Sequence, residues 1–216
     1  MNTKIRYLLS LVLLAAGSQL ASAASPDEAI RPIQTQWAEI RYRQAAPQHA
    51  EQYRALALEA RKVVDSHPGM AEALIWEGIV LSSEAGAKGG LGGLALAKEA
   101  KERLETARSL NETALNGSAY TSLATLYAKV PRWPLGFGDK ERAEIYFKKS
   151  LSINPDGIDP NYFYGEFLLD NSRAAEARGY LEKAVKAAPR PGRELADRGR
   201  RQEAQALLNK LNQESR

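Results

Sequence analysis

Cysteine is absent from all 216 residues of this chain. The absence excludes disulfide bonds, thiolate metal sites and cysteine nucleophiles, and it also excludes a lipid anchor on a cysteine at a processed N-terminus. Histidine occurs only twice, as His49 and His67 in separate segments. No hydroxyl nucleophile stands out beside a base, so we expect no metal, no cofactor and no enzymatic activity.

Long apolar runs are also scarce, and the main one lies at the N-terminus. Lys4 and Arg6 precede an apolar run from Tyr7 to Ala16, and Ala21-Ser22-Ala23 follows it. This order is typical of a secretory signal peptide, here residues 1–23. No later stretch reaches the roughly 18 to 20 apolar residues that a membrane helix needs. We therefore expect a chain without a transmembrane segment that is exported to the bacterial periplasm and cleaved near Ala23.

An excess of charge of one sign is also lacking. The chain has 30 Lys and Arg against 26 Asp and Glu, a formal net charge of +4. Removing Lys4 and Arg6 with the leader lowers this charge to +2. A balance so close to neutral gives no indication of nucleic-acid binding.

A repeat is present. Pro155 and Pro189 lie 34 residues apart, which is the period of a tetratricopeptide (TPR) repeat. Small and large residues occur in the same order before each proline: Gly165, Leu168, Ala177, Leu181, Ala184 and Val185 before Pro189, and Tyr127, Ala143, Phe147, Ser150 and Leu151 before Pro155. A further repeat follows Pro68, with Leu74, Gly78 and Leu81 at the matching positions of its first helix.

The pattern predicts pairs of antiparallel helices that touch at small side chains. Gly165 lies in the middle of an expected helix, where glycine costs about 1 kcal/mol relative to alanine, so a neighbouring helix at Ala177 is expected to press against it. The sequence predicts one all-α domain over residues 24–216: a TPR-like solenoid of about ten helices, clearest at 158–191. A last helix carrying Ala204 and Leu211 is expected to cap its end.

Two insertions interrupt the repeats. One is the glycine-rich stretch 86–93, which lacks the Gly-Lys-Ser/Thr ending of a phosphate-binding loop and is interpreted as a hinge or a close backbone contact. The other, 130–139, contains Trp133, Phe137, two prolines and two glycines. It either packs on the solenoid or presents Trp133 and Phe137 to a partner at low entropic cost.

Two further groups are candidate binding residues. Tyr162 and Tyr164 lie in an aromatic segment whose members cannot all face one side of a helix, so some line the core and others face the groove. Arg190 and Arg193 begin an arginine-rich stretch that could bind a carboxylate or an acidic partner through bidentate hydrogen bonds. Core packing of the tyrosines and a solvated arginine surface remain the alternatives.

Several segments together resemble the T component family, the TPR subunit associated with tripartite ATP-independent periplasmic (TRAP) transporters. The resemblance extends from about Trp37 to Leu211, and it is carried by Ala73–Ile79, Gly89–Gly92, Val130–Asp139, Asn154–Gly165 and Pro189–Arg193. It implies a non-enzymatic periplasmic accessory that binds a solute-binding protein and could also bind a small apolar or organic-acid ligand. Some members of the family carry a lipidated cysteine, which this sequence lacks.

The sequence therefore leaves two hypotheses about the function. The first is a transport accessory that docks a solute-binding protein, with Trp133, Phe137, Tyr162 and Tyr164 as candidate contacts. The second is a general envelope scaffold that assembles other proteins on its concave face and its arginine-rich cap. Self-association through the exposed ends of the helix stack is open in both cases.

Overall fold

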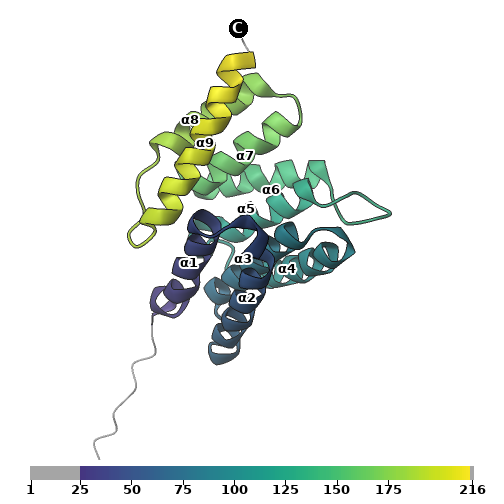
Figure 1. Ribbon diagram of the computed structural model, residues 1–216, viewed down its shortest axis with the longest axis vertical. Coiled ribbons are helices and arrows are strands. Elements are labelled where there is room, and N and C mark those ends of the chain that lie inside the picture. The colour runs from purple at the N-terminus through teal and green to yellow at the C-terminus, as the bar shows by residue number, and fades with distance from the viewer. Residues whose placement is uncertain (1–24, 215–216) are drawn as a thin grey trace, which may run out of the picture.

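The computed structural model describes residues 25–214, so the predicted signal peptide lies outside the described residues. The all-α prediction is confirmed, because this part of the chain contains α-helices, one turn of 3₁₀ helix at Ala46–Gln48 and no strand (Figure 1). About ten helices were expected, and residues 25–214 form nine α-helices. They are α1 (Pro26–Arg43), α2 (His49–Ser66), α3 (Ala71–Lys88), α4 (Gly90–Leu110), α5 (Ala114–Lys129), α6 (Lys140–Ile153), α7 (Ile158–Asp170), α8 (Ala174–Lys186) and α9 (Glu194–Glu214).

Successive helices pack as adjacent pairs, α1 with α2, α3 with α4, α5 with α6 and α7 with α8. The three prolines of the repeat stand just beyond the second helix of a pair, where they cannot disturb its hydrogen bonds. Pro68 follows α2, Pro155 follows α6 and Pro189 follows α8. The helix boundaries therefore agree with the period found in the sequence.

A close contact at a glycine joins the two helices of the pair α7 and α8 and those of the pair α3 and α4. A β-carbon on Gly165 of α7 would lie 2.8 Å from Leu181 and 3.5 Å from the carbonyl oxygen of Ala177 on α8. A β-carbon on Gly78 of α3 would lie 2.6 Å from Leu104 and 3.3 Å from the carbonyl oxygen of Ala100 on α4. In each pair the partner residues are an alanine and a leucine four positions later, so glycine is the residue that lets the two helices approach.

In the pair α5 and α6, an alanine stands at the position that glycine occupies in the other two pairs. Ala124 of α5 lies in one buried cluster with Ala143 and Phe147 of α6, again four positions apart. All three side chains are at most 1% exposed. The three helix pairs are therefore built around equivalent buried positions.

The prediction that residues 86–93 form a loop is wrong. Residues up to Lys88 belong to α3 and residues from Gly90 belong to α4, so Gly89 is the only residue between the helices. The extra residues lengthen the pair: α3 and α4 have 18 and 21 residues, whereas α7 and α8 have 13 each. A β-carbon on Gly93 would lie 2.6 Å from the carbonyl oxygen of Ala85, so small residues here allow the close backbone contact that was one of the interpretations.

The predicted insertion at 130–139 is confirmed as a loop, since α5 ends at Lys129 and α6 begins at Lys140. It projects beyond the helices in Figure 1. Asp139 ends it as the N-cap of α6, with its Oδ1 accepting a hydrogen bond from the backbone N–H of Arg142 at 3.0 Å.

The first helices of the pairs and α9 form a closed circuit. Contacts run from α1 to α3, from α3 to α5, from α5 to α7 and from α7 to α9, and α9 returns to contact α1. Figure 1 shows the N-terminal end of α9 beside α1. The last helix starts at Glu194, earlier than the apolar positions alone indicated, and it packs against α8, α7 and α1.

Candidate functional site

The residues that close the circuit form a cluster of charges between α1, α7, α9 and the connection from α8 to α9. We call it the closing cluster: Arg41, Tyr42, Asp159, Arg190, Arg193, Asp197, Arg200 and Glu203. It contains two of the candidate residues, Arg190 and Arg193, and it lies against a third, Tyr162.

Arg190 is held by two carboxylates of its own chain. Its backbone N–H and its Nη2 donate to the carboxylate of Asp197 at 2.7 and 2.6 Å, and its Nη1 donates to Oδ2 of Asp159 at 2.7 Å. Asp197, in the first turn of α9, is 1% exposed. The guanidinium of Arg190 donates from Nε and Nη2 to one oxygen of Asp197 and from Nη1 to Asp159, so its acceptors are carboxylates of the same chain.

Asp159 lies between two guanidinium groups. Arg200 donates from Nε to Oδ1 of Asp159 at 2.9 Å, opposite the bond from Arg190. Burial alone would raise the pKa of Asp159, but the charges of Arg190 and Arg200 outweigh it and hold the pKa well below its ordinary value. The Arg200 guanidinium also lies 4.6 Å from the ring centroid of Tyr162.

Glu203 joins α9 to α1. Its carboxylate accepts hydrogen bonds from Nη2 of Arg41 at 2.6 Å and from the hydroxyl of Tyr42 at 3.3 Å, and Nη1 of Arg200 donates to it at 2.7 Å. A β-carbon on Gly199 would lie 2.4 Å from the Tyr42 ring, so the two helices are close here. Burial raises the pKa of Tyr42 to about 12.

Arg193 is the arginine of this cluster that has no carboxylate within ion-pair distance among the described residues. Its guanidinium lies 4.8 Å from the ring centroid of Trp76 on α3. Its buried Nε has no hydrogen-bond acceptor in the described structure. Burial, together with the nearby charge of Arg190, lowers the pKa of Arg193 to about 10. Arg193 thus attaches the start of α9 to α3 by stacking.

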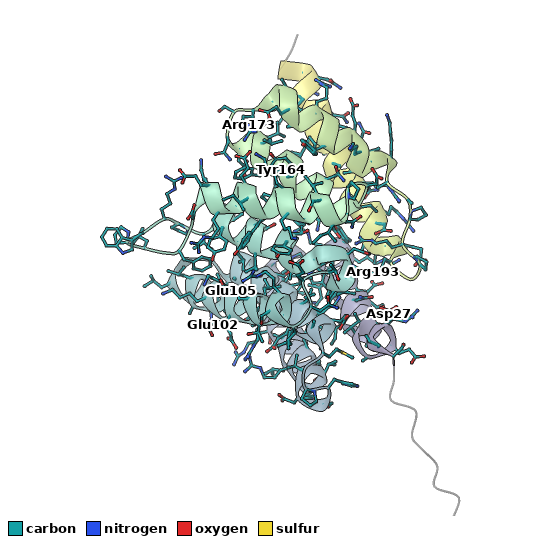
Figure 2. The ribbon with its side chains drawn as sticks, turned by 180° about the vertical axis from the view of Figure 1, so that it is seen from behind. Asp27, Glu102, Glu105, Tyr164, Arg173 and Arg193 are labelled. Carbon is teal, nitrogen blue, oxygen red and sulfur yellow. The ribbon has the colours of Figure 1, made fainter. Side chains whose placement is uncertain are left out.

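The two candidate tyrosines are core residues. Tyr162 and Tyr164 are 6% and 2% exposed, and their hydroxyls donate to Glu166 at 3.3 Å and to Glu144 at 3.1 Å. Figure 2 shows Tyr164 near Arg173 and well apart from Arg193. The six predicted site residues therefore do not converge on one place.

The 130–139 loop separates its two candidate residues. The Phe137 ring packs inward, edge-on to Tyr127 with ring centroids 5.6 Å apart. The Trp133 side chain points outward and is 85% exposed. Phe137 therefore packs on the protein, whereas Trp133 is exposed, and its contact with a partner stays a prediction.

Sequence reasoning missed Arg41, Asp159 and Glu203 as members of this cluster. The pair Arg200 and Glu203 carries a local signal, because residues three apart on a helix face the same way. No local sequence pattern indicates the contact of Glu203 with Arg41, because 162 residues separate them. Such a contact depends on how the helix pairs stack.

One shallow, open depression of the described surface lies along α1, and another lies between α1, α3 and the connection from α4 to α5. Within residues 25–214, no group of three His, Asp or Glu side chains is placed to hold a metal ion. None of the helices described is long and apolar enough to cross a bilayer.

No family model matches this chain, and a search of the curated proteins finds none that matches it.

Proposed function

We propose that this chain is a TPR-like helical-repeat protein whose function is to bind another protein. The observation that carries the proposal is the shared buried order of the helix pairs: Gly78, Gly165 or Ala124 on the first helix, with an alanine and a large residue four positions later on the second. Stacked pairs of this kind bury a continuous core and offer extended surfaces to partners.

The partner that the resemblance to the T component family favours is a solute-binding protein of the periplasm. In this proposal the chain is exported, catalyses no reaction, and acts as an accessory while the solute-binding protein carries an apolar or organic-acid ligand. The carboxylates of the closing cluster support a structural role, since Asp159, Asp197 and Glu203 are each paired with arginine.

The docking face is proposed to be the outer surface. Repeat proteins of this type commonly hold partners against their inner helices. Here α9 contacts both α1 and α7 and closes the gap between them with the chain's own residues. A partner that lay between α1 and α7 would need the cluster around Asp159 to open, whereas the outer surface needs no rearrangement.

The test is a crosslinked pull-down of the tagged protein from its native periplasm, with captured proteins identified by mass spectrometry. An unrelated tagged periplasmic protein serves as the control. We expect a solute-binding protein to be enriched over that control. Enrichment of envelope-assembly proteins without any solute-binding protein would instead favour the general scaffold.

A further inference from the structure

The 130–139 loop ends in an exposed and mainly apolar tip, defined here as residues 131–135. All five residues of the tip are exposed, and four of them are apolar. Trp133 and Leu135 are 85% and 69% exposed. Contiguous exposed apolar surface, unlike single scattered apolar residues, commonly marks an interaction site.

The base of the loop is held firmly, so the tip is presented in a defined orientation. The backbone N–H of Gly138 donates to the carbonyl of Pro131 at 2.9 Å, and the N–H of Asp139 donates to the carbonyl of Tyr127 at 2.9 Å. A β-carbon on Gly138 would lie 1.9 Å from the carbonyl oxygen of Val130, so only glycine allows this closure. Little conformational entropy remains to be lost when the tip binds.

The beginning of α4 extends the apolar surface. A β-carbon on Gly136 would lie 3.3 Å from Cδ1 of Leu94, which places the first turns of α4 against the loop. Leu91, three residues before Leu94 and therefore on the same side of the helix, is 84% exposed. Trp133, Leu135 and Leu91 thus belong to neighbouring segments of the surface.

Cations lie beside this apolar surface. Residues 85–98 include Lys88 and Lys98, and residues 130–138 include Arg132, with Glu84, Glu99 and Asp139 directly outside these stretches. Glu99 and Asp139 lie within ion-pair distance of Arg61 and Arg142, and the charge of Lys88 acts on Glu84. Lys98 and Arg132 form no ion pair among the described residues, so their positive charge borders the apolar surface.

We propose that the tip and the first turn of α4 dock on the surface of an anionic phospholipid bilayer. An indole prefers the boundary between headgroups and acyl chains, and lysine and arginine are attracted to anionic headgroups. The tip is convex and projects beyond the helices (Figure 1), and a bilayer accommodates such a shape without a preformed recess. The proposal adds a membrane contact to the proposed function and assigns Trp133 to lipid rather than to the solute-binding protein.

The test is sedimentation of the processed protein, purified from the periplasm, with vesicles of phosphatidylglycerol and phosphatidylethanolamine at about 0.1 M salt. Vesicles of phosphatidylcholine alone are the control. We expect binding to the anionic vesicles that falls as salt is added. The double variant Trp133→Ala/Leu135→Ser is expected to bind about tenfold more weakly, because it loses the apolar surface that would enter the bilayer.

Matched variants separate the tip from the rest of the surface. Ile145 on α6 is 64% exposed, and Ile145→Ser should leave vesicle binding unchanged. Arg132→Glu is expected to weaken binding about fivefold, whereas Lys183→Glu, the same change of charge on α8, should have a smaller effect. Brominated lipids should quench the fluorescence of Trp133 but not of the buried Trp37 and Trp76, which are 8% and 4% exposed.

Failure of this proposal is distinguishable from failure of the proposed function. If the wild-type protein ignores anionic vesicles, or if the double tip variant binds them as well as the wild type does, the lipid assignment is wrong. If the tip variant instead loses capture of the solute-binding protein, the tip is a protein contact and the accessory function stands. Loss of vesicle binding with capture retained supports both proposals.

Discussion

The closing cluster and the loop tip use the same types of residue in opposite ways. In the cluster, Arg190 is bound by two carboxylates and Arg193 lies over the ring of Trp76, so cations and aromatic groups are satisfied within the chain. In the tip, Arg132 has no ion-pair partner among the described residues, and Trp133 is 85% exposed. The same residue types are therefore held by partners of the same chain in one region and exposed in the other.

The largest effect is expected from removing the central carboxylate of the cluster. Asp159→Ala leaves Arg190 and Arg200 facing each other without the anion between them, and it should lower the free energy of unfolding by about 2–3 kcal/mol. Glu176→Ala, which removes a carboxylate from an exposed pair with Arg173, should cost at most about 0.5 kcal/mol. Urea unfolding of both variants measures the difference. Equal costs would mean that the cluster does not hold α9 in place.

The same carboxylate predicts a dependence on pH. Because the folded pKa of Asp159 is depressed by its two arginines, its stabilisation is fully present above the unfolded pKa of about 4 and is lost as the pH falls below it. The stability gap between the wild type and Asp159→Asn should therefore be constant from about pH 6 to 8 and should shrink below about pH 4. A gap that persists unchanged into strong acid would show that the charge on Asp159 is not what stabilises the fold.

The two aromatic residues of the loop should behave differently. Phe137→Ala removes a ring packed on Tyr127 and is expected to lower the free energy of unfolding by about 1.5 kcal/mol. Trp133→Ala removes a side chain that is 85% exposed and should change it by at most about 0.5 kcal/mol. Thermal unfolding of the two variants is the measurement. Similar losses would mean that Trp133 is packed on the protein rather than presented to a partner.

Two glycines, one in close contact with a neighbouring helix and one without such a contact, should respond to alanine with stability changes of opposite sign. Gly165→Ala would place a methyl group 2.8 Å from Leu181, and overpacking of this kind should cost about 1 kcal/mol. Gly179→Ala on α8 meets no atom within 4 Å and should stabilise the helix by up to about 1 kcal/mol. Denaturant midpoints of both variants give the signs. A stabilising Gly165→Ala would contradict the close contact between α7 and α8.

Much of the helical organisation could be predicted, because it depends on local patterns. The prolines ended helices where the period placed them, and Gly165 faces a neighbouring helix as its mid-helix position required. The 130–139 loop has the expected limits, since Val130-Pro131 and Pro134 cannot continue α5. In these places residues close in sequence determine the outcome.

The rest depended on contacts between distant segments. The stretch 86–93 looked like a loop because of its glycines. In the structure Gly93 lies against the backbone of Ala85 on α3, and Gly89 and Gly90 adopt positive φ where α3 turns into α4. The circuit through Arg41 and Glu203 joins residues 162 positions apart, and no residue spacing within either helix predicts this contact. For the same reason the sequence could not tell that Phe137 turns inward while Trp133, four residues earlier, turns outward.

The most direct test of the account is whether α9 closes the inner circuit against α1 in solution. The chain has no cysteine, so Tyr42→Cys/Gly199→Cys introduces a single pair of thiols at the point where a β-carbon on Gly199 would lie 2.4 Å from the Tyr42 ring. The measurement is the number of thiols that react after mild oxidation of the monomer. We predict that both disappear through an intramolecular disulfide, while Leu58→Cys/Gly199→Cys keeps both. If both thiols of Tyr42→Cys/Gly199→Cys stayed reactive, the closed circuit would be wrong, and the surface between α1 and α7 would again be a candidate docking surface.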